Sequence, residues 1–419
     1  MSLGPVGGRR AQRGECEVRR SIAGPLVALA LLAGGAPAAA QTAAPGVPER
    51  PFAPPTGPHA IGTEDAMWVD SSRVEPFTRD PNDRRRMMVQ IWYPAVAAPD
   101  AEPAPYFQRI DEFAAGSPVR RAAPVRTNAV VGAPVLAGRE RFPVLLYNHG
   151  GGWTRFSGTF TIEHLVSHGY VVVSVGHPGF NMTAQFPDGS KYALDTLALP
   201  QPVAGADLLA TALAGWDHLE RHVFPAWVAD ARFALDRIEQ IDRTPDHPLA
   251  GRLDLDRIGA LGWSFGGATA IHLSHVDPRV KAAVDQDGQL FGSVATEGTA
   301  RPVMLFHSDP PPAPSGDNAR AAMEELMARV QATTRTMLSR STGDWYDLPI
   351  SGSTHGHYSD LTLFGMGGAM KLEARRGHGI INAYTLAFCD RYLKGRPSPL
   401  LDGASPDFPE VVFSSNRRD

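Results

Sequence analysis

One stretch of the sequence decides the fold: residues 258–273, which read IGALGWSFGGATAIHL. It begins with an apolar, strand-like run, Ile258–Leu261, and continues after Gly266 and Gly267 as a run of helix-forming residues. Ser264 lies between them in Gly-Trp-Ser-Phe-Gly, the G-x-S-x-G pattern of a nucleophile elbow, with the strand–turn–helix context that this motif requires. The glycines permit a tight turn that lifts the serine hydroxyl above the sheet. Ser264 is therefore the candidate nucleophile.

The segments on either side of this elbow predict an α/β fold. Continuous apolar strands that alternate with helices are typical of a mostly parallel central sheet with helices on both faces. Together with the elbow, they indicate the α/β-hydrolase fold. The expected strands are Val144–Tyr147, Val171–Val175, Ile258–Leu261, Val280–Val284 and Val303–Phe306, and the expected helices include Phe160–His168, Trp227–Ile241 and Ala319–Val330.

The first 60 residues are expected to lie outside the folded body. Several arginines precede the apolar stretch Pro25–Ala33, and the small residues that end at Ala40 suit a signal peptidase, so residues 1–40 resemble an export signal peptide. The apolar stretch is far shorter than the roughly 20 residues of a membrane-spanning helix. Residues 41–60 are rich in Pro, Ala and Gly and predict a flexible tether. We therefore expect a periplasmic or secreted protein, cleaved near Ala40, without a membrane span.

Residues 61–419 are expected to form a single α/β-hydrolase domain. Its N-terminal extension, 61–138, contains a strand-like run at Met87–Tyr93 that Pro94 should stop. Residues 179–253 form an insertion before the elbow, with two amphipathic helical candidates. The sequence leaves open whether this insertion is an ordinary crossover or a cap over the site.

Composition excludes several other classes of protein. The chain has 419 residues, of which 43% are hydrophobic and 20% charged, values near the globular average, so whole-chain disorder does not fit. The formal net charge of −4 gives no positive field for nucleic acid, and the two cysteines form no zinc-type Cys/His spacing. We expect no metal, no cofactor and no nucleic-acid partner, and the sequence leaves the oligomeric state open.

A serine nucleophile needs a histidine base, and in this fold the histidine follows the serine in the chain. His355 stands in a Gly/Ser-rich turn after the strand-like run Trp345–Ile350. His357, two residues on, is the competitor. We favour His355 because it directly follows the small-residue turn at the expected end of the strand.

The carboxylate that orients this histidine has several candidates. Asp285 and Asp287 follow the strand that ends at Val284, whereas Asp309 follows the next strand, Val303–Phe306. Many α/β-hydrolases place the acid after the later strand, which favours Asp309. The local pattern alone leaves the choice open.

A second glycine-rich turn supplies donors for the oxyanion of an acyl-transfer reaction. A strand-like run ends at Asn148 and continues as His149 followed by three glycines. Unhindered backbone amides in such a turn can approach a substrate carbonyl, and Gly151 would provide one donor. The amide of Phe265, just after the nucleophile, would provide the other. His149 is expected to pack beneath the loop in a structural role.

Taken in order, these motifs resemble the plasma and type II platelet-activating-factor acetylhydrolase family of α/β-hydrolase serine esterases. The resemblance covers about Met87 to Leu363. It rests on the segments Asn148–Gly152, Val175–His177, Asp256–Ile258, Gly262–Thr269, Asp287–Phe291 and Gly352–His355.

The resemblance implies roles for particular residues. That family takes its acid after the strand preceding the usual one, in an Asp-x-x-x-Phe context, which selects Asp287 and supports His355. The chain departs from the family at Gln289, commonly tryptophan, and at Gly292, commonly proline, which puts the shape of the substrate site in question. Hormone-sensitive-lipase esterases share a His-Gly-Gly-Gly turn but have acidic and alanine neighbours around the serine, unlike Trp263 and Phe265.

These observations predict an exported, metal-free serine carboxylesterase that acts through an acyl-serine intermediate on short-chain or lipid-type esters. Ser264, His355 and Asp287 form the expected triad, and the amides of Gly151 and Phe265 hold the oxyanion. One alternative is a polyester or lipase-like hydrolase of insoluble esters, which exposed aromatic residues at Trp153, Phe156 and Trp263 would suit. Another is a catalytically silent α/β-hydrolase-fold binding protein, against which an intact triad argues.

Overall fold

The computed structural model describes residues 48–113, 118–181, 183–193, 198–200, 206–366 and 370–417. The expected signal peptide, 1–40, and the first part of the expected tether, 41–47, lie outside these described residues. None of the helices in the described ranges is both long enough and apolar enough to cross a membrane.

The centre of the molecule is a ten-stranded sheet in the order β12-β11-β10-β9-β8-β4-β5-β2-β1-β3. From β11 to β5 all neighbouring strands are parallel, whereas β2 pairs antiparallel with both β5 and β1, and β12 pairs antiparallel with β11. The strands are β1 Ala60–Val74, β2 Arg84–Ala95, β3 Ala129–Val131, β4 Phe142–Asn148, β5 Val171–Val175, β8 Leu253–Trp263, β9 Val280–Gln286, β10 Val303–His307, β11 Trp345–Pro349 and β12 Ser414–Ser415.

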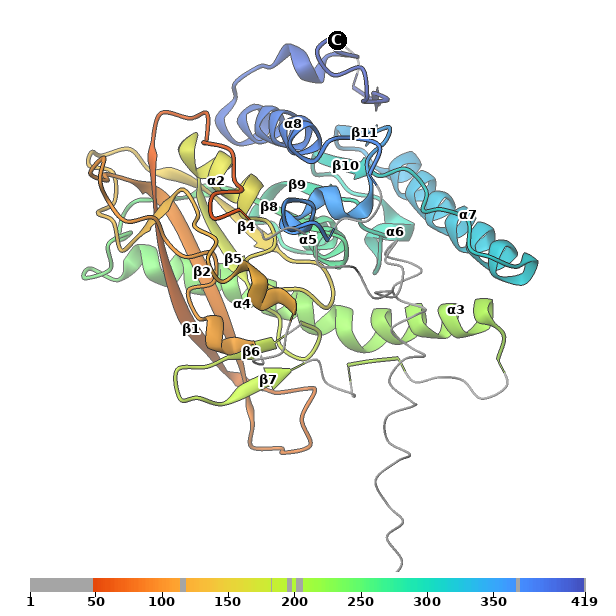
Figure 1. Cartoon of the computed structure of the whole chain (residues 1–419), viewed down its shortest axis with the longest axis horizontal. Helices are drawn as coiled ribbons and strands as arrows, with labels where there is room; N and C mark the ends of the chain where they lie inside the picture. The colour runs from red at the N-terminus through yellow and green to blue at the C-terminus, as the bar shows by residue number, and fades with distance from the viewer. Residues whose placement is uncertain are drawn as a thin grey trace, which may run out of the picture.

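Helices cover both faces of this sheet (Figure 1). One face packs against α2 (Thr159–Ser167) and α8 (Ala374–Lys394), and the other against α4 (Phe224–Arg243), α5 (Phe265–Val276) and α7 (Asp317–Arg340). The central strands are buried on both faces, which is why they read as continuous apolar runs in the sequence. The α/β-hydrolase prediction is confirmed.

The remaining elements are short and lie mainly in connections. A separate two-stranded hairpin consists of β6 and β7. The hairpin strands are β6 Thr183–Gln185 and β7 Lys191–Ala193. The other short elements are α6 Val294–Glu297, η1 Ile110–Glu112, η2 Pro118–Ala122, η4 His355–Tyr358, η5 Asp360–Phe364 and η6 Pro399–Leu401.

The N-terminal extension adds a strand that the sequence pattern does not reveal. β1 pairs with β2 along most of its length, from Ala60 opposite Ala95 to Asp70 opposite Arg85. The expected stop at Pro94 is wrong, because β2 continues through it. The Pro94 carbonyl accepts a hydrogen bond from the amide of Leu136, so this residue still pairs through its one remaining backbone group.

The expected tether over 41–60 is also wrong over its described part. The side chain of Phe52 is buried and stacks on Tyr106, with ring centroids 5.7 Å apart. The carbonyl of Glu49 accepts a hydrogen bond from Arg126, and the amide of Gly57 donates to the hydroxyl of Ser167. Residues 48–59 therefore pack on the domain. A Pro-rich composition does not prevent this packing when an aromatic side chain such as Phe52 is buried against the domain.

The insertion 179–253 contains the crossover from β5 to β8. Its helix α4 packs on the sheet through a row of buried residues that includes Ala231, Leu235 and Ile238. Before it, α3 (Leu208–His218) passes through a π-helical turn, Leu219–Val223, directly into α4. Figure 1 shows α3 reaching out from the body on the same side as α7, which it contacts. The insertion thus contains the crossover helix, α4.

Candidate active site

Ser264 stands at the apex of the turn between β8 and α5. Its backbone has φ 58° and ψ −123°, a positive-φ conformation rarely adopted by residues other than glycine, and the residue is half-buried. Gly266 is required by close approach, because a Cβ there would lie 2.1 Å from the carbonyl oxygen of Asn148. The elbow therefore packs directly against the end of β4, where the glycine-rich turn begins.

Asp287 lies just after β9 and holds His355. The His355 ring nitrogen Nδ1 is 2.7 Å from the Asp287 carboxylate oxygen Oδ2. Asp287 has φ 62°, and it shares a positive φ only with Ser264 among the non-glycine residues that the structure describes. Strain at two neighbouring strand ends is characteristic of residues whose position is fixed for function.

Ser308, which sequence reasoning missed, is a second partner of this carboxylate. Its amide donates to Asp287 Oδ1 at 2.7 Å, and its hydroxyl donates to Oδ2 at 2.8 Å. Burial alone would raise the pKa of Asp287, but the hydrogen bonds from His355 and Ser308 outweigh it and keep the pKa below its usual range. Asp287 therefore stays ionised and can orient an imidazole.

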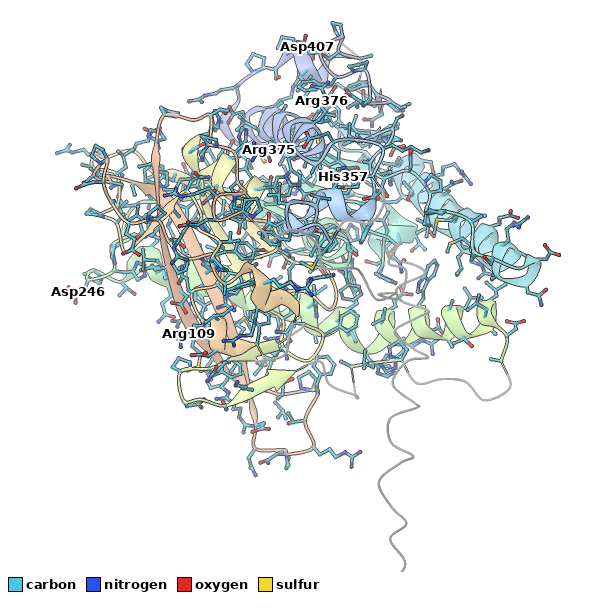
Figure 2. The ribbon with its side chains drawn as sticks, in the orientation of Figure 1. Arg109, Asp246, His357, Arg375, Arg376 and Asp407 are labelled. Atoms are coloured by element: carbon cyan, nitrogen blue, oxygen red, sulfur yellow. The ribbon has the colours of Figure 1, made fainter. Side chains whose placement is uncertain are left out.

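His355 also contacts Trp263, the residue before Ser264. The Trp263 indole N–H donates to the carbonyl of His355 at 3.1 Å, and the two rings lie 5.1 Å apart. This fixes the histidine turn beside the elbow. His357, labelled in Figure 2, is buried elsewhere: its Nδ1 accepts from the amide of Thr354, and its Nε2 donates to the carbonyl of Leu372. The structure therefore brings His355, and not His357, to Asp287.

The other two candidate acids have different partners. Asp309 accepts a hydrogen bond from the amide of Gly352 at 2.9 Å and supports the base of the histidine turn. Asp285 is fully buried below the elbow, where it accepts from the amide of Gly288. Neither carboxylate has a recorded contact with His355 in the described part of the chain, so the structure pairs His355 with Asp287.

Burial raises the pKa of Asp285 from an ordinary value of 3.8 to about 8. Folding then favours the protonated carboxyl, whereas the unfolded chain releases the proton above about pH 4. The contribution of Asp285 to the free energy of unfolding is greatest below about pH 4 and is lost as the pH rises from about 4 to about 8.

We expect Asp285→Asn to remove this loss. From pH 5 to pH 8.5 this group should lower the unfolding free energy of the wild type by several kcal/mol, since each pKa unit corresponds to about 1.4 kcal/mol. The unfolding free energy of the variant should not fall in this way, so the difference between variant and wild type should grow by the same amount. Urea unfolding at both pH values measures the difference, with Asp309→Asn as the half-buried control. Parallel pH profiles for wild type and Asp285→Asn would contradict a protonated Asp285.

The glycine-rich turn after β4 lies beside the elbow that carries Ser264. The amide of Gly152 donates to the carbonyl of Phe180 at 3.0 Å, and a Cβ at Gly151 would lie 2.5 Å from the Phe180 ring. The same ring packs edge-on against Phe265 with centroids 5.5 Å apart. Gly151 and Phe265 thus both lie against the Phe180 ring. Within the described residues, neither of their amides has a recorded protein acceptor.

The three aromatic residues expected to be exposed near the site behave differently. Phe156 and Trp263 are buried in the core, and only Trp153 is half-buried, with its ring 5.9 Å from that of Trp263. The pattern that suggested an aromatic surface for insoluble esters is therefore absent among these residues.

The backbone explains why glycine, and not the proline common in the acetylhydrolase family, stands at position 292. The φ of Gly292 is 74°, which proline cannot adopt.

Beneath the glycine-rich turn lies a buried polar network that sequence reasoning missed. It connects Asn148 and His149 with His177, Asp230 and Arg85. One signal could have revealed it. Asp230 lies three residues after Trp227 and four before Ala234, on the apolar face of α4, where a carboxylate needs a buried partner.

Comparison with a solved structure defines the class. A ferulic acid esterase from Streptomyces cinnamoneus matches 87% of this chain and 99% of its own, with a TM-score of 0.67 and 30% sequence identity. The chain therefore belongs to the α/β-hydrolase-fold esterases.

Two curated proteins connect it with the platelet-activating-factor acetylhydrolases, as the motifs implied. A probable 1-alkyl-2-acetylglycerophosphocholine esterase of Arthroderma benhamiae is 25% identical over 297 residues, which are 65% of this chain and 66% of that protein. The platelet-activating factor acetylhydrolase of Cavia porcellus is 23% identical over 283 residues, which are 64% of this chain and 61% of that protein. The chain thus matches slightly less than two thirds of either relative's length. No family model matches it.

Proposed function

We propose that this protein is a serine carboxylesterase that forms an acyl-serine intermediate on short-chain or lipid-type esters. Ser264 attacks the carbonyl carbon, His355 takes the serine proton and returns it to the leaving alcohol, and Asp287 orients the histidine. The amides of Gly151 and Phe265 stabilise the oxyanion. The observation that carries the proposal is the 2.7 Å contact between His355 and Asp287 beside the strained Ser264 elbow.

The two groups of similar proteins suggest different esters. The acetylhydrolase relatives suggest the acetyl ester of a glycerophospholipid, and the solved structure suggests a hydroxycinnamoyl ester. We favour a small acyl group, because Phe180 fills the space next to both proposed oxyanion donors.

A substrate panel tests this preference. Purified protein would be assayed with 4-nitrophenyl acetate, 4-nitrophenyl octanoate, 1-alkyl-2-acetylglycerophosphocholine, methyl ferulate and an insoluble polyester film. We expect kcat/KM to be highest for the two acetyl esters. Higher values for methyl ferulate or for the film would overturn the acyl preference. Failure both to hydrolyse any ester and to react with a fluorophosphonate probe would favour the silent binding protein.

We also propose that the protein is exported to the periplasm or secreted after cleavage near Ala40. The support is the arginine-rich segment followed by an apolar stretch and small residues in 1–40. Amino-terminal sequencing of protein recovered from outside the cytoplasm should begin at or near Gln41. An intact Met1 in that fraction would contradict the proposal.

A further inference from the structure

A cluster of charged side chains lies beneath the glycine-rich turn and takes no part in the proposed triad. Arg85, Asp230 and Glu75 are each buried, with exposed fractions of 0%, 0% and 2%. The Arg85 guanidinium binds Asp230 through two nitrogens, at 2.9 and 2.6 Å, and Glu75 through its third, at 2.8 Å. Burying charged groups is costly even when they are paired. The presence of three buried charged side chains therefore needs an explanation other than stability.

His177 connects this cluster with the glycine-rich turn. Its Nδ1 lies 3.0 Å from Asp230 Oδ2, and its ring stacks on Trp227 at 4.0 Å between centroids. Its Nε2 lies 3.1 Å from the side-chain oxygen Oδ1 of Asn148, the last residue of β4. The ionised Asp230 accepts a hydrogen bond from Nδ1–H, and this bond together with the stacking on Trp227 holds the imidazole in place. The ring therefore has one orientation.

His149 carries the connection one step further. The backbone amide of His177 donates to His149 Nε2 at 3.1 Å, which places the His149 proton on Nδ1. Nδ1 lies 2.7 Å from the carbonyl oxygen of Gly150 and donates to it. Burial lowers the pKa of His149 to about 3, so the ring is neutral at pH 7 and keeps this arrangement.

The carbonyl of Gly150 belongs to the same peptide unit as the amide of Gly151. A trans peptide is planar, with its C=O and N–H pointing in opposite directions, so fixing the carbonyl also fixes the amide. We propose that Asp230, His177 and His149 form a positioning chain that sets the Gly150–Gly151 peptide plane and thereby aims the Gly151 N–H at the oxyanion. This inference rests on the proposed esterase function and adds positioning residues to it.

The test separates the two hydrogen bonds of His149. In His149→Asn, the side-chain amide nitrogen can occupy the position of Nδ1 and still donate to Gly150. In His149→Gln, the side-chain amide reaches the position of Nε2 instead and loses the donor to Gly150. We expect His149→Gln to lower kcat for 4-nitrophenyl acetate on the order of 10- to 100-fold with little change in KM, and His149→Asn to restore most of it.

Three further measurements distinguish positioning from a structural defect. Rates are expressed per site that reacts with a fluorophosphonate, which removes any unfolded fraction. The affinity for a trifluoromethyl ketone, which forms a tetrahedral oxyanion on a serine, should fall in parallel with kcat/KM. Asp230→Asn should also lower kcat, and the double variant with His149→Gln should lose no more than His149→Gln alone, because both act through one chain.

The outcomes are decisive in either direction. If kcat per labelled site in His149→Gln stays within twofold of the wild type, or if His149→Asn loses as much as His149→Gln, the positioning chain is wrong. If the losses of kcat from Asp230→Asn and His149→Gln are additive in the double variant, Asp230 is not part of the positioning chain. If the wild type neither hydrolyses esters nor reacts with the fluorophosphonate, the proposed function fails instead.

Discussion

Replacing Ser264 with alanine should abolish hydrolysis of 4-nitrophenyl acetate, with a loss of kcat on the order of 10⁵-fold or more. The hydroxyl is the proposed nucleophile, and no other group at the elbow can form the acyl intermediate. Because alanine meets the same backbone strain at φ 58° as serine does, unfolding free energy should change by less than about 0.5 kcal/mol. Initial rates and urea unfolding measure the two effects.

A matched control is available at the same position. Ser264→Gly should be equally inactive but more stable than the wild type by about 1 kcal/mol, because glycine adopts positive φ without strain. Retention of esterase activity in either variant would exclude Ser264 as the nucleophile. A glycine variant less stable than the alanine variant would contradict the strain at this residue.

Replacing Asp287 with asparagine should lower kcat by about 10⁴-fold, the size of loss seen when a triad carboxylate becomes an amide. The amide of Ser308 donates to Oδ1, so the asparagine oxygen should stay there and its NH₂ group should replace Oδ2. Nδ1 of His355 would then face a donor and have to release its proton. The proton would move to Nε2, and the ring could no longer act as a base toward serine.

Asp309→Asn provides the comparison. Its oxygen can still accept from the amide of Gly352, so kcat should stay within about threefold of the wild type. Asparagine also tolerates the positive φ of Asp287, so both variants should fold. A large loss in Asp309→Asn with an active Asp287→Asn would show that the acid follows β10, contrary to the geometry.

The sheet was largely predictable because its central strands are buried on both faces. β5 occupies Val171–Val175, the range expected from its apolar run. β1 was not predictable, because its residues are a mixture of exposed, intermediate and buried, and buried members such as Thr63 and Asp70 are polar. Its pairing with β2, rather than its own composition, makes it a strand.

The part of the candidate site that a motif specifies through its backbone conformation was predictable. The choice of acid was not, because it depends on which carboxylate lies closest to His355. Gly-Trp-Ser-Phe-Gly specifies a strand, a turn and a helix, and the structure has them in that order. Asp287 and Asp309 both follow parallel strands, so their side chains reach the same edge of the sheet. Only the direction of the turn at Asp287, with the Ser308 hydrogen bonds, selects one of them.

The positive φ angles of Ser264 and Asp287 have a consequence for laboratory evolution. Each position costs the folded state on the order of 1 to 3 kcal/mol, and glycine at either one would recover part of it. A selection for heat resistance alone would therefore favour variants that have lost Ser264 or Asp287 of the proposed triad. Thermostable descendants of this enzyme should be sought by selecting on residual turnover after heating, with both positions held fixed in the library.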